Sequence, residues 1–229
     1  MSSSSRTAEE AKADNIKAMG RPVGEQYSAL WQELVWLYAV WGEYVDLYGT
    51  NAPRVELMNR AAGGFFRIVQ DAVWEQTLLH IARLTDPARS AGKPNLSVQS
   101  LLAVVSEPAP RRAVETKVKA AVEASAFCRD WRNRRIAHRD LDLALKNPTQ
   151  PLAPASRLQV RNALDRIADV LNTLSLHYLH SETYFEGGLV HSGTSLLNLL
   201  RSALTERDER QARIKRGECP PEDFKKNPL

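Results

Sequence analysis

Apolar residues that recur every three to four positions over long stretches constrain this chain more than any other feature. Between residues 24 and 48 the recurring residues are Tyr27, Leu30, Trp31, Leu34, Tyr38, Trp41, Tyr44, Val45 and Tyr48. This spacing places the side chains on one face of an α-helix. No segment alternates apolar and polar residues as a half-buried strand does, so the pattern predicts an all-α fold.

Three further long helices follow from the same spacing. They are predicted from about Pro53 to Leu84, from about Arg111 to Ala137, and from a cap at Ser156 to about His180. A short helix capped by Ser97 and a last helix over about 194–216 complete the set. The fold class is therefore an up-and-down helical bundle with additional short helices and polar termini. Gly63-Gly64 inside the second helix predicts a kink or a close helix contact.

Composition divides the chain into three parts. We predict a flexible N-terminal arm or frayed helix over 1–20, the helical bundle over 21–185, and a C-terminal helix with a polar tail over 186–229. The chain has 229 residues and a net charge of +4, which permit a good-sized core and an anionic partner such as RNA.

The same composition argues against several protein classes. The start of the chain lacks the apolar stretch of a signal peptide, and no run of about 18 apolar residues would span a membrane. We therefore expect a cytoplasmic protein without a membrane partner. Cys128 and Cys219 do not make a disulfide framework. A glycine-rich phosphate loop, a Gly-x-Ser-x-Gly elbow and a zinc-ligand series are all missing from the sequence.

The third long helix carries the residues that point to chemistry. At 100° per residue, its small and mostly apolar stripe lies within about 40° of one direction, and the members are Val114, Val118, Ala121, Ser125 and Cys128. Arg132 continues the centre of this stripe, and His138 lies about 120° away if the helix stays straight. Arg129, Arg134, Arg135 and Arg139 add positive charge near the helix end, where cations are favoured.

A charge on a buried stripe needs an explanation, because burying an unpaired charge costs several kcal/mol. Arg132 therefore has a carboxylate partner such as Asp86 or Glu115, faces a cavity, or faces a subunit interface. If the stripe tolerates apolar residues, truncation of Arg132 should leave the melting temperature unchanged or raise it. Arginine clusters at helix ends are also commonly solvated, so periodicity alone leaves a structural role open.

The order Arg132-Asn133 and then His138 resembles the motif of HEPN proteins, an Arg and a polar residue followed by His. Two flanking sequence segments look like those of the U-type abortive-infection branch of that superfamily. They are Ala137-His138-Arg139-Asp140-Leu141 and Ala82-Arg83-Leu84-Thr85-Asp86. The helix order agrees, and the resemblance covers roughly residues 25–180.

This resemblance implies a two-fold dimer and, in active members, a metal-independent endoribonuclease of toxin or phage-defence type. The catalytic roles fall on Arg132 and His138, with Asn133 as the supporting polar residue, and RNA contacts fall on Arg129, Arg134, Arg135 and Arg139. No cofactor is expected. The implied partners are RNA, a second copy of the chain and an antitoxin or defence-system protein. The alternatives are a non-cleaving module that binds RNA, a nucleotide or a protein, and a purely structural bundle.

Two other groups of residues are weaker candidates, because ordinary packing explains them. His177 and His180 are three residues apart on one helix, but no carboxylate or cysteine pattern joins them into a metal site. Four tryptophans have the residue type that stacks nucleic-acid bases, but at helical spacing a place in the core is favoured; they are Trp31, Trp36, Trp41 and Trp74. One departure from the family stands out: some HEPN toxins have a tyrosine two residues after the histidine, where this chain has Asp140.

Overall fold

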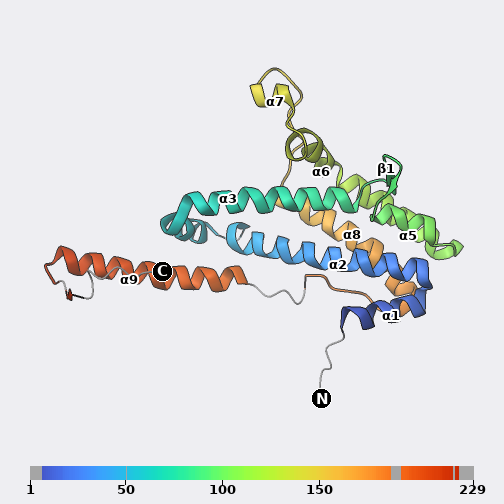
Figure 1. Ribbon diagram of the computed structural model, residues 1–229, viewed down its shortest axis with the longest axis horizontal. Helices are drawn as coiled ribbons and strands as arrows, with labels where there is room; N and C mark the ends of the chain where they lie inside the picture. Colours follow the sequence, from blue (N-terminus) through green and yellow to red (C-terminus); the bar gives the residue numbers. More distant parts are fainter. Residues whose placement is uncertain (1–6, 50, 187–191, 219, 222–229) are drawn as a thin grey trace, which may run out of the picture. The chain divides into compact units, whose positions relative to one another are not determined.

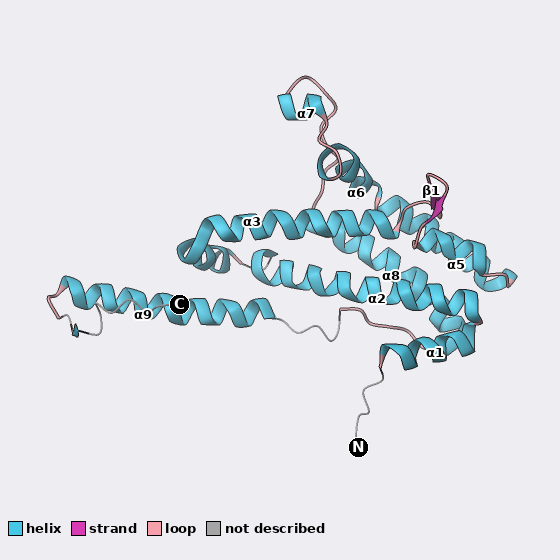
Figure 2. Cartoon of the chain, in the orientation of Figure 1, coloured by secondary structure: helices cyan, strands magenta, loops and turns pink. Residues whose placement is uncertain are grey.

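The computed structural model describes residues 7–49, 51–186, 192–218 and 220–221. These residues are almost entirely helical (Figure 2), which confirms the all-α prediction. The chain forms two compact units, one from residues 1–41 and 73–189 and the other from 42–72 and 190–229. Each unit is described by itself below. The three-part division read from composition stays a prediction.

The first unit holds most of the helices (Figure 1). Its longer helices are α1 (Ala8–Met19), most of α2 (Arg21–Tyr44), the C-terminal part of α3 (Ala52–Leu84), α5 (Pro108–Ala124) and α8 (Arg157–Leu179). Its shorter elements are η2 (Val98–Ser100), α4 (Leu101–Val104), α6 (Ala126–Trp131), η3 (Arg132–Ile136) and α7 (Leu141–Leu145). Helices α5 and α8 pack directly on each other.

Leucine and isoleucine side chains from α2, α3, α4 and α8 fill the core of this unit. Those that are almost completely buried are Leu30, Leu34, Leu37, Leu78, Ile81, Leu101, Leu164, Ile167, Leu171 and Leu174. Their spacing within each helix is the three- to four-residue spacing seen in the sequence, because only that spacing turns successive side chains to one face. The bundle is thus held by apolar burial along helix faces.

Capping residues set the ends of the clearest helices. Ser156 accepts a hydrogen bond from the backbone N–H of Gln159, whose side chain in turn accepts from the backbone of Ser156. This capping box fixes the start of α8, as predicted. Thr7 and Glu10 form a second capping box at the start of α1, so a regular helix occupies the part of the predicted arm that the structure describes.

The second unit contains η1 (Val45–Gly49), the N-terminal part of α3 and α9 (Ser192–Lys215). Its core is a cluster of Leu47, Met58, Phe66 and Leu197. The backbone of Ala62 leaves the helical region (φ −161°, ψ 67°) beside Gly63-Gly64, which confirms a kink in the second predicted helix. The Glu43 carboxylate accepts from the backbone N–H groups of Ser192 and Gly193 and so caps α9.

The structure corrects three details of the sequence interpretation. A hairpin of β1 (Arg89–Ser90) and β2 (Lys93–Pro94) forms where no strand was predicted. Ala91 and Gly92 form the turn with positive φ. Because both strands are exposed, the sequence has no alternation of apolar and polar residues that would indicate them. Ser97 lies at the start of η2, but its side chain makes no capping hydrogen bond.

The third correction concerns the tryptophans. Trp41 is buried and contacts Trp74, and the indole N–H of Trp31 donates to Thr183, whereas Trp36 is 59% exposed and is not part of the core. In the described part of the chain, none of the helices is long and apolar enough to cross a membrane. Cys219 and most of the predicted polar tail lie outside the described residues.

Candidate functional site

The predicted motif lies where a helix changes its winding. The third predicted helix is divided at Ser125 into α5 and α6, and η3 then follows over Arg132–Ile136 with π-helical winding. The backbone N–H of Ala137 donates to the carbonyl of Arg132 at 2.8 Å, a bond that spans five residues. The angle of 120° between Arg132 and His138 assumed a straight α-helix and therefore does not apply.

The predicted apolar stripe is buried as expected, and Arg132 continues it. Val114, Val118, Ala121, Ser125 and Cys128 are all buried. The Arg132 side chain is 23% exposed and is paired with Asp86, whose side chain is 17% exposed. Of the explanations left open for this charge, the structure therefore supplies a carboxylate partner.

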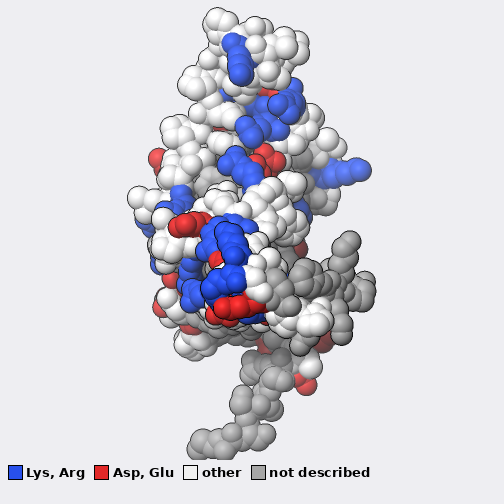
Figure 3. All heavy atoms as spheres, turned by 90° about the vertical axis from the view of Figure 1, so that its left-hand side faces the viewer, with Lys and Arg blue, Asp and Glu red and all other residues white. Residues whose placement is uncertain are grey.

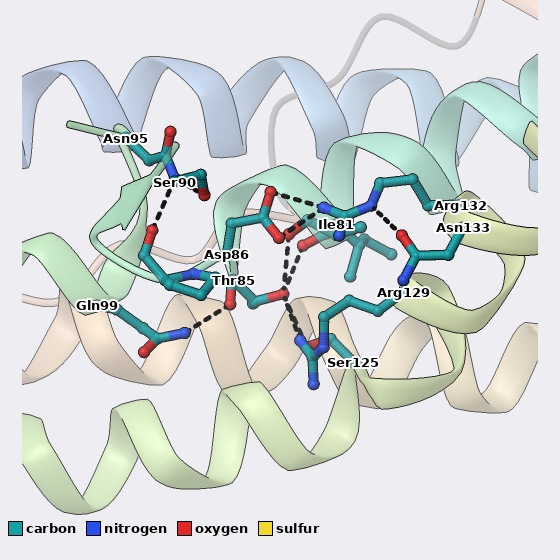
Figure 4. A network of polar contacts seen from close by, with 12 residues as sticks. Ile81, Thr85, Asp86, Ser90, Asn95, Gln99, Ser125, Arg129, Arg132 and Asn133 are labelled. Atoms are coloured by element: carbon teal, nitrogen blue, oxygen red, sulfur yellow. Dashed lines mark hydrogen bonds and ion pairs between the residues drawn. The ribbon is translucent and has the colours of Figure 1, made fainter. Parts of the chain in front are cut away.

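The contacts of Arg132 use its donors unequally (Figure 4). Its Nη1 donates to Oδ1 and Oδ2 of Asp86 at 2.6 and 2.7 Å, and its Nε donates to Oδ1 of Asn133 at 3.0 Å. Within the described residues Nη2 makes no hydrogen bond. The guanidinium is thus fixed on two sides and keeps one amino group for a ligand.

This pairing changes the expected outcome of truncating Arg132. Loss of the guanidinium would leave the largely buried carboxylate of Asp86 without its partner, which costs stability. We therefore expect truncation of Arg132 to lower the melting temperature, and not to leave it unchanged or raise it. The stripe is apolar only up to Cys128, and at Arg132 it meets a carboxylate from the end of α3.

A buried polar network lies beneath this pair. The Ser125 hydroxyl donates to the hydroxyl of Thr85 at 2.8 Å, and Arg129 donates to Thr85, Ser125 and the carbonyl of Val122. Figure 4 shows these side chains converging on Thr85 and Asp86 at the end of α3. Asp86 was a predicted partner of Arg132, whereas nothing in the sequence assigned a role to Thr85, although both belong to the segment Arg83-Leu84-Thr85-Asp86.

Arg129 is part of this network rather than of the open surface. Burial lowers the pKa of its guanidinium below the usual value; the Asp86 carboxylate opposes that shift, and the charge of Arg132 adds to it. Arg129 therefore supports the end of α3 from below, and its place among the predicted RNA contacts stays a prediction that this geometry does not favour.

His138 lies in a bend two residues after η3, and it is exposed. Within the described chain its imidazole has no hydrogen bond or ion pair. Asn133 is also exposed, with its side-chain oxygen on Arg132. The three predicted catalytic residues thus lie on one short segment, with Arg132 fixed and His138 open to solvent.

The remaining arginines near the motif differ in their hydrogen-bond and ion-pair partners. Arg134 donates to the carbonyls of Gln150 and Pro151 and pairs with Asp130, so it ties down the linker before α8. The Nε of Arg135 donates to Glu75 at 3.2 Å, and its guanidinium lies over the ring of Trp131. Arg139 is exposed and makes no hydrogen bond or ion pair with the described residues.

Asp140 has a structural role at the position where some HEPN toxins carry tyrosine. Its carboxylate accepts from the backbone N–H of Leu143 at 3.0 Å and so caps α7. It also lies 3.7 Å from Nε of Arg134. Asp140 therefore holds α7 beside the motif and supplies no phenol there.

Neither histidine of the alternative metal pair has a ligand set. His177 contacts Glu107 at 3.3 Å, and His180 ends α8 with a positive φ. The described residues include no group of three or more His, Cys, Asp or Glu side chains placed to hold a metal ion.

Comparison with known families decides the identity of this bundle. The family model for the AbiU2 branch of HEPN domains matches residues 21–198. The chain belongs to the HEPN AbiU2 family. The match covers α2 through the start of α9, and so it includes the Arg132 segment and its partner Asp86. Comparisons with curated proteins and with solved structures returned no match.

Proposed function

We propose that this HEPN protein is a metal-independent endoribonuclease that cleaves RNA with Arg132 and His138. Membership of the AbiU2 family supports a role in abortive infection, and within that role we propose a toxin or phage-defence effector that acts in the cytoplasm. The observation that carries the proposal is the state of Arg132, which is fixed by Asp86 and Asn133 while Nη2 keeps its donors.

RNA brings its own nucleophile to such a site. The 2′-hydroxyl attacks the adjacent phosphorus, the 5′-oxygen of the next nucleotide leaves, and the products are a 2′,3′-cyclic phosphate and a 5′-hydroxyl. The Nη2 donors of Arg132 would bind the phosphate oxygens as negative charge grows on them. An imidazole gives or takes a proton near neutral pH, and the solvent-exposed ring of His138 is open to do so. Asn133 would act by holding Arg132 in this orientation.

The proposal includes a two-fold dimer, because one proton donor and one proton acceptor are needed and each chain offers one His138. Exposed leucines beside the motif support an interface there, since Leu141 and Leu145 of α7 are 69% and 61% exposed. Light scattering that gives the mass of a monomer at micromolar concentration would remove the dimer from the proposal.

A non-cleaving binding module is the second candidate, and one observation favours it. Both Nη1 donors of Arg132 are already given to Asp86, so a bound phosphate receives only part of the guanidinium. Such a protein would hold RNA, a nucleotide or an antitoxin-like partner without cutting RNA.

A cleavage assay on labelled RNA in excess EDTA separates these candidates. We expect cleavage by the wild type and a loss of about 10²–10⁴-fold for His138→Ala, as for removal of a proton-transfer group. Arg132→Lys should lose about 10²–10³-fold while keeping the charge. His177→Ala, a histidine substitution on α8, is the matched control and should cut like the wild type.

Each other outcome has a definite meaning. Cleavage that needs added magnesium or zinc would overturn the mechanism, and a fully active His138→Ala protein would overturn the enzyme. RNA binding without cleavage would select the second candidate. If a site takes Arg132 from one chain and a single His138 from the other, an equimolar mixture of His138→Ala and Arg132→Lys protein should regain part of the activity that each lacks. If one site needs both His138 residues, the mixture should stay inactive.

A further inference from the structure

A cavity of about 250 Å³ lies beside the motif, and no step of the proposed cleavage uses it. It is formed where α7 and Leu152, which precedes α8, lie beside the arginines of residues 134–139. Its walls include Glu75, Arg134, Arg135, Arg139, Leu143 and Leu152. Glu75 pairs with Arg135, and Asp130 and Asp140 pair with Arg134, so Arg139 is the arginine of this lining that has no carboxylate partner among the described residues. In Figure 3, Lys and Arg atoms are visible at the height that α6 and α7 have in Figure 1, and others lie lower on the same face.

Two of the three guanidinium groups have donors to offer. The Nε of Arg135 is held by Glu75 and its plane lies over Trp131, while no hydrogen bond within the described residues uses its Nη groups. Arg139 has no partner among the described residues. Arg134 instead forms a wall, because its Nη groups donate to the carbonyls of Gln150 and Pro151. The donors that remain for a ligand are thus the Nη groups of Arg135 and the whole guanidinium of Arg139.

The lining is mixed in a way that suits a nucleotide. Forked guanidinium donors match phosphate oxygens, and the apolar side chains of Leu143 and Leu152 offer a surface for a base or a ribose. Pockets that enclose a whole drug-sized ligand occupy about 300–1,000 Å³, so this smaller cavity fits one unit of a longer chain.

The cavity also lies within reach of a strand held at the motif. Arg139 follows His138 directly, and consecutive Cα atoms are about 3.8 Å apart. Arg135 belongs to the same η3 turn as Arg132. We infer that this cavity binds one nucleotide of the RNA adjacent to the cleaved phosphate, with the phosphate of that nucleotide on Arg135 and Arg139. The inference rests on the proposed ribonuclease function and adds a subsite that selects RNA longer than a dinucleotide.

The test compares substrates that differ by one nucleotide. A dinucleotide contains only the phosphate that is cut, and trinucleotides extend it on the 5′ or the 3′ side. For the wild type we expect kcat/KM to be about 10- to 100-fold higher for one of the two trinucleotides, as one charge-assisted contact would give. Arg139→Ala should remove most of that ratio. Arg112→Ala removes an exposed arginine outside the cavity and should keep it.

A second variant tests the cavity rather than the charge. Leu152→Trp places a large side chain in the cavity and should also lower the ratio of trinucleotide to dinucleotide cleavage. Equal kcat/KM for all three substrates, or a ratio that neither variant changes, would overturn the subsite and leave the ribonuclease intact.

Binding measured by fluorescence anisotropy with labelled oligonucleotides separates this failure from failure of the enzyme proposal. If RNA is not cut but the trinucleotide binds more tightly than the dinucleotide through Arg139, the subsite stands and the ribonuclease falls. If neither cleavage nor Arg139-dependent binding is found, both fall. A polyglutamate peptide that displaces the trinucleotide at equal charge concentration would overturn the choice of a nucleotide and favour an acidic protein segment.

Discussion

Replacing Asp86 with asparagine tests whether this carboxylate positions Arg132. Asparagine keeps the shape of the side chain and one acceptor oxygen, but it removes the negative charge that Arg132 and Arg129 both interact with. An exposed ion pair contributes about 0–1 kcal/mol, and breaking a fully buried one costs about 3–5 kcal/mol. With about a fifth of each side chain exposed, we expect Asp86→Asn to lower the free energy of unfolding by about 2 kcal/mol.

Three measurements test the role of Asp86. Thermal unfolding should show a melting temperature lower by about 4–8 °C for a chain of this size. RNA cleavage at a temperature where the variant is fully folded should fall by about 10²-fold, because a small displacement of a catalytic group has that effect. A double-mutant cycle with Arg132→Gln isolates the pair, and the coupling energy should lie within about 1–3 kcal/mol.

The control is a carboxylate that makes an exposed ion pair. Asp71→Asn disrupts an exposed pair with Arg67 and should change stability by less than about 1 kcal/mol. The reasoning is refuted if Asp86→Asn is as stable and as active as the wild type, or if the double-mutant cycle gives a coupling energy near zero.

Three further predictions concern the interior of the protein. Burial lowers the pKa of His80 from 6.5 although Glu33 opposes the shift, so the unfolded chain binds the proton more tightly than the folded one. The free energy of unfolding should therefore be highest above about pH 6.5 and fall as the pH drops. Denaturant titrations from pH 8 to 5 should show a smaller fall for His80→Gln than for the wild type. Burial raises the pKa of the Cys128 thiol to about 12, so with the chain's other cysteine replaced by serine a thiol reagent at pH 8 should label the protein only after denaturation, and rapid labelling of native protein would contradict this. A Cβ atom on Gly24 would lie 2.5 Å from the backbone of α1, so Gly24→Ala should lower the melting temperature, whereas Gly64→Ala in α3 meets no atom within 4 Å and should leave it unchanged or raise it; equal effects of the two substitutions would count against the close contact.

Sequence alone predicted what depends on neighbours within one or two turns. The start of α8 at Ser156 follows from a capping box whose two partners are three residues apart. The buried stripe from Val114 to Cys128 follows from helical spacing, which stayed valid across the break at Ser125. The kink in α3 follows from the paired glycines beside it. Each of these signals is local, and so periodicity and capping rules suffice to read it.

Tertiary structure decided how the motif is held. Asp86 and Arg132 are 46 residues apart, and sequence left Glu115 as an equal candidate for the partner of Arg132. The end of α3 must be packed against α6 before one carboxylate is chosen, because an ion pair needs its two groups within about 4 Å.

The inward turn of Arg129 has the same origin. Arg129 and Arg134 look alike in the sequence, yet one donates to the buried Thr85–Ser125 pair and the other to the linker carbonyls of Gln150 and Pro151. Which donors remain for a ligand is settled by these distant partners. The sequence determined where the helices form and which residues make the motif. Packing determined which charges of the motif stay available, because a guanidinium pairs with whichever acceptor the fold brings within reach.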